Sequence, residues 1–107
     1  IRYRACFKTL VSQDSLRQVY QVLERAEPRV APGWFGCFDA VRIGVALETG
    51  AAVAFMGHEN ISYGIDRIVA IDSDGTGYVW HQINRCGKVV FDGRRAPADC
   101  APSPEGN

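Results

Sequence analysis

Two runs rich in β-branched residues, at 65–72 and 76–83, place the strongest constraint on the fold of this chain. In the first run Ile65, Arg67, Val69 and Ile71 alternate with the remaining residues, which is the period of a β-strand. The Asp-Ser-Asp-Gly segment at 72–75, between the runs, has the composition of a tight turn. We therefore expect an antiparallel β-hairpin across residues 65–83.

Further apolar runs on both sides extend this hairpin into a sheet. Residues 1–8 alternate between apolar and polar side chains and predict an N-terminal strand. The runs at 37–48 and 51–57 predict two strands that meet at Thr49-Gly50, and residues 88–91 predict a last strand. The sheet then has about five antiparallel strands after the first.

One amphipathic helix is predicted between the N-terminal strand and the sheet. It begins at Ser12 or Asp14, which are suitable N-caps, and stops before Pro28. Its apolar residues recur at intervals of three and four: Leu16, Val19, Tyr20, Leu23 and Ala26. The fold class is therefore α+β, with the helix packed on one face of the sheet and the other face partly open.

Length and composition predict one compact domain at 1–100, followed by a flexible, proline-containing tail at 101–107. The chain has 107 residues, of which 47% are apolar and 22% are charged, so disordered and fibrous classes are excluded. Twelve basic and twelve acidic residues cancel, so a polyanion would be held by a local site and not by bulk attraction. No apolar run is long enough to cross a membrane. We also expect the protein to be a monomer.

Four cysteines are spread along the chain without a Cys-x-x-Cys pair or a histidine at zinc spacing: Cys6, Cys37, Cys86 and Cys100. This pattern favours two disulfides over a metal site, and with them a secreted, extracellular protein. Of the three possible pairings we expect Cys6–Cys100 and Cys37–Cys86. Cys6 alternates with apolar residues in the first strand, so we expect it on the polar face, within reach of a strap across the outside of the sheet.

Three side chains are candidates for acid–base chemistry on RNA. Cleavage by transphosphorylation requires a base for the ribose 2′-hydroxyl, a cation for the phosphate and an acid for the leaving oxygen. Glu48, Arg67 and His81 supply these groups in that order. If they lie on three successive strands, they converge on the concave side of a twisted sheet.

The chain resembles the small secreted fungal ribonucleases that cleave after guanosine. The resemblance rests on Tyr3 and Cys6 ahead of a single helix, on Phe38-Asp39 ahead of Glu48, and on the run from Gly64 through Asp66-Arg67 to His81. It implies that Glu48 is the general base, Arg67 the phosphate clamp and His81 the general acid. It further implies a terminal strap at Cys100, RNA as the partner, and no metal or organic cofactor.

Four other residues are candidates for contact with the substrate. Glu59 is the reserve base, because His58-Glu59 offers a second carboxylate with its own histidine. Trp34 and Phe35, in a predicted loop at 29–36, form either an aromatic binding edge or a closure of the core against the helix. Strand alternation also leaves open whether Arg67 lies in a substrate groove or is a buried structural cation.

Two functions other than a ribonuclease with toxin or virulence activity fit the same pattern. The first is a non-catalytic, disulfide-stapled binding module, such as an inhibitor, an immunity protein or an effector that binds a protein partner. The second is a cystatin-like sheet that binds a protease or a small ligand at a loop edge or between helix and sheet. A ribonuclease requires Glu48 or Glu59 to join Arg67 and His81 on an exposed face.

Overall fold

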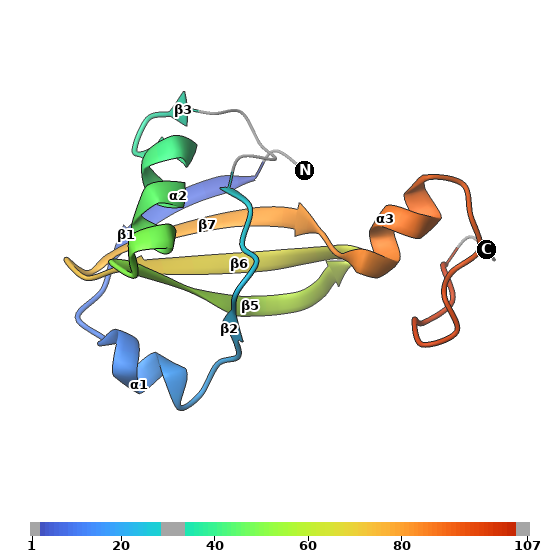
Figure 1. Cartoon of the computed structure of the whole chain (residues 1–107), viewed down its shortest axis with the longest axis horizontal. Helices are drawn as coiled ribbons and strands as arrows, with labels where there is room; N and C mark the ends of the chain where they lie inside the picture. Colours follow the sequence, from blue (N-terminus) through green and yellow to red (C-terminus); the bar gives the residue numbers. More distant parts are fainter. Residues whose placement is uncertain (1–2, 29–33, 105–107) are drawn as a thin grey trace.

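Five antiparallel strands form one sheet in the computed structural model, which describes residues 3–28 and 34–104, with Trp34 and Phe35 described by their backbone alone (Figure 1). The strand order is β1-β7-β6-β5-β2. The bounds are β1 Arg4–Lys8, β2 Val22–Leu23, β5 Ala52–Ser62, β6 Ile65–Asp72 and β7 Thr76–Ile83. A separate two-stranded hairpin pairs β3 Trp34–Phe35 with β4 Phe38–Asp39. The predicted hairpin at 65–83 is confirmed with its bounds, as is the α+β class with two disulfides.

Three short helices accompany the sheet, and each begins at a side chain that caps it. These are α1 Gln13–Arg17, α2 Ala40–Thr49 and α3 Arg85–Phe91. Ser12, Asp39 and Asn84 accept hydrogen bonds from backbone N–H groups of the first turn of α1, α2 and α3, respectively. In Figure 1, α3 lies beyond the end of the sheet, away from α1 and α2.

The predicted helix, which begins at Ser12 or Asp14 and stops before Pro28, is confirmed at its Ser12 cap but is wrong beyond Arg17. Helix α1 ends at Arg17, and Val22 and Leu23 pair with Phe55 and Ala54 at the edge of the sheet. The apolar residues do recur at intervals of three and four, but Val19 is 75% exposed, so it does not pack on the core as a longer helix would require. Pairing with β5 satisfies the backbone groups that an extended helix would have used.

Two predicted strands are helices instead. Residues 40–49 form α2, because Asp39 accepts from the N–H groups of Val41 and Arg42 and Gly50 ends the helix at φ 82°. Residues 88–91 belong to α3. The β-branched residues of these segments suggested strands, but both helix starts carry capping side chains. Thr49-Gly50 is therefore a helix end and not a hairpin turn.

The face of the sheet that contacts α2 holds the main core, and we call it the core face. Ala54, Ile68, Ala70 and Trp80 of the sheet pack against Phe38, Ala40 and Ile43. Phe38 lies edge-on to Trp80 with ring centroids 5.8 Å apart. Leu47 of α2 extends the same contact, so a stripe at spacings of three and four faces the sheet.

The opposite face is covered mainly by α1, and we call it the open face. Its residues alternate with those of the core face: Phe7 on β1, Val53 and Phe55 on β5, Arg67, Val69 and Ile71 on β6, and Val79 and His81 on β7. Leu16 of α1 packs against Val53, Phe55 and Ile71. Helix α1 has five residues and is too short to cover the open face, so several apolar side chains of that face stay partly exposed.

The two disulfides join Cys6 to Cys37 and Cys86 to Cys100, so the predicted pairing of Cys6 with Cys100 and Cys37 with Cys86 is wrong. Cys6 packs on the core face, beside the start of α2, because the alternating polar-looking residues of β1 face inward. Arg4 on the same side lies over the Phe38 ring at 5.4 Å. Cys86 lies at the start of α3 and holds the segment that follows α3.

A close backbone contact fixes α3 against the turn between β5 and β6. A Cβ on Gly87 would lie 2.2 Å from the carbonyl oxygen of Gly64, so neither position has room for a side chain. Asp66, only 6% exposed, accepts from the backbone N–H of Asn60 and from Asn84 Nδ2, both at 2.9 Å. Beyond Cys100, Tyr63 Oη donates to the carbonyl of Ala101. The last three residues of the predicted tail lie outside the described residues.

Candidate functional site

Arg67 and His81 meet on the open face, one residue opposite the other on β6 and β7. Arg67 Nε donates a hydrogen bond to His81 Nε2 at 3.1 Å. Both side chains are partly buried, so the pair is reachable from solvent without being fully hydrated. The pairing of these two residues, expected from the sequence, is therefore present.

Tyr3 completes this cluster from the residue just before β1. Its ring stacks on His81, with centroids 4.7 Å apart and planes inclined by 19°. The guanidinium of Arg67 lies over the same ring, 5.0 Å from its centroid. We call these three residues the Tyr3–Arg67–His81 cluster. Strand alternation in residues 1–8 places Tyr3 on the apolar face of the predicted N-terminal strand, but nothing in the local sequence predicts that its ring contacts His81 and Arg67.

His81 is an uncharged acceptor in this cluster. Partial burial lowers the pKa of His81 below its ordinary value, and the nearby charge of Arg67 lowers it further. Because Nε2 accepts from Arg67, its lone pair is occupied and the nitrogen holds no proton. The predicted role of general acid requires a protonated imidazole, which this arrangement disfavours.

Neither candidate carboxylate pairs with the cluster. Glu48 lies on α2, which packs on the core face, so the expectation of three neighbouring strands that converge on one face is wrong for Glu48. Glu59 is exposed on β5. Across residues 3–28 and 34–104 the ion pairs are Arg17–Asp14, Arg85–Asp99 and Arg94–Asp92. Arg67 therefore has no carboxylate partner in the described part of the chain.

The remaining predicted site residues lie at the edges of this face or outside the described residues. His58 is exposed and stands opposite Arg67 in the pairing of β5 with β6, where the register shifts between Met56 and His58. His58, Arg67 and His81 therefore occupy paired positions on the adjacent strands β5, β6 and β7. The backbones of Trp34 and Phe35 form β3, and their side chains lie outside the described residues.

An apolar pocket of about 280 Å³ adjoins Arg67, and we call it the α1 pocket. Leu16 and Tyr20 line it from α1 and the turn that follows, and Arg67 lies among its lining residues. The rest of its wall comes from Phe7, Thr9, Val11, Phe55, Gly57, Val69 and Ile71. Sequence reasoning missed this pocket, although the alternation of 67–71 was visible, because the helix expected to cover the face was more than twice as long as the five residues of α1.

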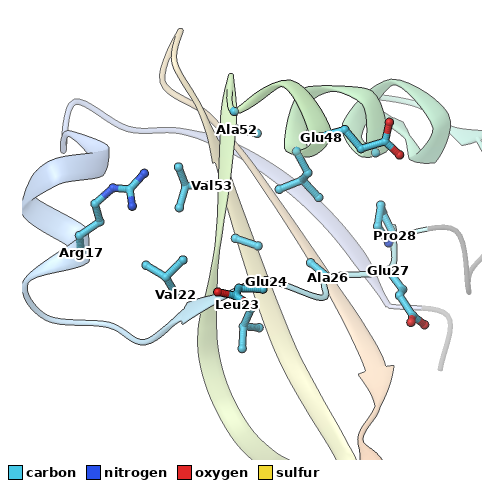
Figure 2. A pocket seen from close by; sticks show the side chains of 14 residues that line it. Arg17, Val22, Leu23, Glu24, Ala26, Glu27, Pro28, Glu48, Ala52 and Val53 are labelled. Carbon is cyan, nitrogen blue, oxygen red and sulfur yellow. The ribbon is translucent and has the colours of Figure 1, made fainter.

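A second, wider hollow of about 740 Å³ lies between α2, β2 and the segment that follows β2 (Figure 2). Figure 2 shows Glu48 on α2, across the hollow from Glu24 and Glu27. Its floor is apolar and includes Leu23, Ala52 and Ala54. Glu48 belongs to this hollow and not to the Tyr3–Arg67–His81 cluster.

Comparison with known proteins places the chain in a family. The family of unknown function DUF6446 matches residues 1–101. The chain belongs to DUF6446. No curated protein and no solved structure matches it. The DUF6446 match spans both disulfides, the Tyr3–Arg67–His81 cluster and the α1 pocket, so these features lie within the family's domain.

The described residues of this DUF6446 chain offer no group of three or more His, Cys, Asp or Glu side chains that is placed to hold a metal ion. In the turn at 72–75, Asp72 Oδ1 and Asp74 Oδ1 accept from the N–H groups of Ser73 and Thr76. Over the same residues no helix combines the length and apolar character needed to span a membrane.

Proposed function

We propose that the chain is a non-catalytic binding module that receives a negatively charged group of its ligand at Arg67 on the open face. The observation that carries this proposal is an arginine that is held in place by His81 and Tyr3 and has no carboxylate partner in the described part of the chain. A partly buried guanidinium without a counter-ion favours an anionic ligand.

The surroundings of Arg67 support binding over catalysis. Tyr3, Phe7, Val11 and Tyr20 are large apolar or aromatic side chains that remain at least 40% exposed near this face. Exposed apolar surface around a fixed cation is typical of a ligand site. The two disulfides brace the fold and favour an oxidising compartment, which agrees with the expectation of an extracellular protein.

Anion binding is tested by NMR titration of the ¹⁵N-labelled chain with sodium acetate at pH 7.5 and constant ionic strength. We expect the Arg67 Nε–H signal and the His81 ring signals to shift and saturate. Arg67→Gln should abolish the shift of the His81 signals, whereas Arg94→Gln should leave both shifts unchanged, because Arg94 is exposed and pairs with Asp92. Shifts that never saturate, or that persist in Arg67→Gln, would overturn the proposal.

Ribonuclease activity is the second candidate, and the placement of an arginine and a histidine side by side on a partly exposed face favours it. In such a reaction the 2′-hydroxyl gives its proton to a base and attacks phosphorus, the bond to the 5′-oxygen breaks, and that oxygen takes a proton from the protonated form of His81, which yields a 2′,3′-cyclic phosphate and a 5′-hydroxyl. Glu48 is not available as the base, so His58, in register with Arg67, or Glu59 would have to accept the proton.

The second candidate is tested by incubating single-stranded RNA with the wild-type chain and with His81→Ala, and by detecting cyclic phosphate ends. Loss of cleavage in His81→Ala, with cleavage retained in Glu48→Ala, would support a ribonuclease. Absence of cyclic phosphate ends from the wild-type reaction excludes it. Equal cleavage by wild type and His81→Ala excludes the role of His81.

A further inference from the structure

The α1 pocket is open because the five-residue α1 covers only part of the open face, and Gly57 lets the neighbouring strand pack closely at the floor of the pocket. A Cβ on Gly57 would lie 2.9 Å from Val69 Cγ2 and 3.4 Å from Arg67 Cγ. Val69 and the stem of Arg67 therefore pack directly against the backbone of Gly57 on the floor of the pocket, where a side chain would have no room. The apolar surface is therefore continuous from Leu16 and Ile71 to the stem of Arg67.

The wall of this pocket is apolar except at three positions. Thr9, Tyr20 and Arg67 carry polar side-chain atoms, whereas the remaining lining residues are aliphatic, phenylalanine or glycine. A volume of about 280 Å³ is close to the lower end of the range for small-molecule sites, roughly 300–1,000 Å³. The pocket therefore fits a short hydrocarbon chain and not a folded partner.

The charge at the polar end of the pocket is a single positive one. Arg67 uses Nε to contact His81 and stacks on Tyr3, and no hydrogen bond of its two Nη groups is found within the described residues. His81 is uncharged, because its Nε2 accepts a hydrogen bond from Arg67, so it adds no second charge. With Nε bonded to His81, the two Nη groups of one planar guanidinium remain to pair with one carboxylate.

We propose that the ligand is a small organic acid with one carboxylate and an aliphatic chain, bound with the carboxylate on Arg67 and the chain in the α1 pocket. This inference rests on the proposed function, since it requires Arg67 to receive an anion. It adds the apolar half of the ligand, which the cluster alone does not specify. Gly57 and Leu16 then set the chain length that the pocket accepts.

Isothermal titration calorimetry with octanoate, acetate and octanol at pH 7.5 tests this assignment. We expect octanoate to bind at least about tenfold more tightly than acetate or octanol, because it alone satisfies both halves of the site. Arg67→Gln should weaken octanoate binding by at least about tenfold, and Arg94→Gln should not change it. Intermolecular NOEs should connect the octanoate chain to the methyl groups of Val69 and Ile71.

The outcomes separate the two proposals. If acetate binds in an Arg67-dependent manner and octanoate binds no tighter, the pocket is not part of the site and this inference fails, while the proposed function stands. If octanol binds as tightly as octanoate, Arg67 does not hold the ligand and the inference also fails. If neither acid binds, both proposals fail.

Discussion

His81 Nε2 accepts a hydrogen bond from Arg67, the residue directly opposite it on the neighbouring strand. The same nitrogen would have to bind a proton for His81 to become charged at low pH. An imidazole in this position opposes protonation for two reasons, its partial burial and the adjacent guanidinium. The cluster is thus intact only while His81 is neutral, which couples the stability of this face to pH.

The first prediction is a loss of stability as the pH falls below about 6.5. In the unfolded chain His81 takes up a proton near its ordinary pKa of 6.5, whereas in the folded chain its pKa is lower. The unfolded state therefore binds more protons between these two values, and the free energy of unfolding decreases as the pH falls through that window. Below the folded pKa this contribution stays constant.

Urea denaturation of the wild type and of His81→Gln at half-unit steps from pH 7.5 to 5 measures this effect. Glutamine keeps an acceptor for Arg67 but does not titrate, so the difference between the two curves isolates His81. Parallel curves over the whole range would contradict the prediction.

The second prediction concerns the contact between Gly64 and Gly87. Alanine at Gly87 favours the helix but forces Cβ to within 2.2 Å of a backbone oxygen, so we expect a net loss of about 2 kcal/mol or more in unfolding free energy.

The other side of this contact is tested by Gly64→Ala, with Gly93→Ala as its matched control. Both glycines have positive φ, near 80°, but nothing lies within 4 Å of a Cβ at Gly93, so only the backbone cost of about 1 kcal/mol applies there. Equal effects of Gly64→Ala and Gly93→Ala on the urea midpoint would show that α3 is not packed as described.

The third prediction concerns the buried carboxylate of Asp66. Asp66→Ala removes the acceptor for two donors, Asn60 N–H and Asn84 Nδ2, and should destabilise the fold by about 1–3 kcal/mol. Asp66→Asn keeps one side-chain oxygen and should recover part of this loss. A urea denaturation series of the three proteins measures the order, and a destabilisation of Asp66→Asn as large as that of Asp66→Ala would contradict it.

The fourth prediction is the disulfide pairing itself. Trypsin under non-reducing conditions should release residues 5–8 linked to residues 30–42, and residues 86–88 linked to residues 96–107. Mass spectrometry identifies both linked peptides. A mass for residues 5–8 linked to residues 96–107 would instead show the Cys6–Cys100 pairing and contradict this prediction. Replacing Cys6 and Cys37 together by serine should cost about 3–4 kcal/mol in the chain-entropy model, a little more than replacing Cys86 and Cys100, because the loop closed is 31 residues and not 14.

The accuracy of sequence reasoning differed between local and distant features. Strands β6 and β7 were predicted with their bounds because the alternation and the turn at 72–75 are both local signals. Helix α2 was missed because Val41, Ile43 and Val45 alternate like a strand, although Asp39 and Gly50 marked its two ends. That single error carried Glu48 to the wrong face of the sheet.

The candidate site followed the same division. Arg67 and His81 were paired correctly because they belong to one hairpin. Tyr3 and the α1 pocket depend on contacts between segments far apart in the sequence, and no spacing within either segment announces them. The disulfides failed for a related reason, since the direction in which Cys6 points depends on which face of β1 meets the core.

Each disulfide joins cysteines that are consecutive along the chain, the first with the second and the third with the fourth. Synthesis and any translocation proceed from the N-terminus, so Cys6 and Cys37 become available for oxidation before Cys86 and Cys100. Simple oxidation in order of appearance therefore yields the native pairs, with no intermediate that must be reshuffled by thiol exchange. Oxidative maturation of this domain should then proceed without a disulfide isomerase.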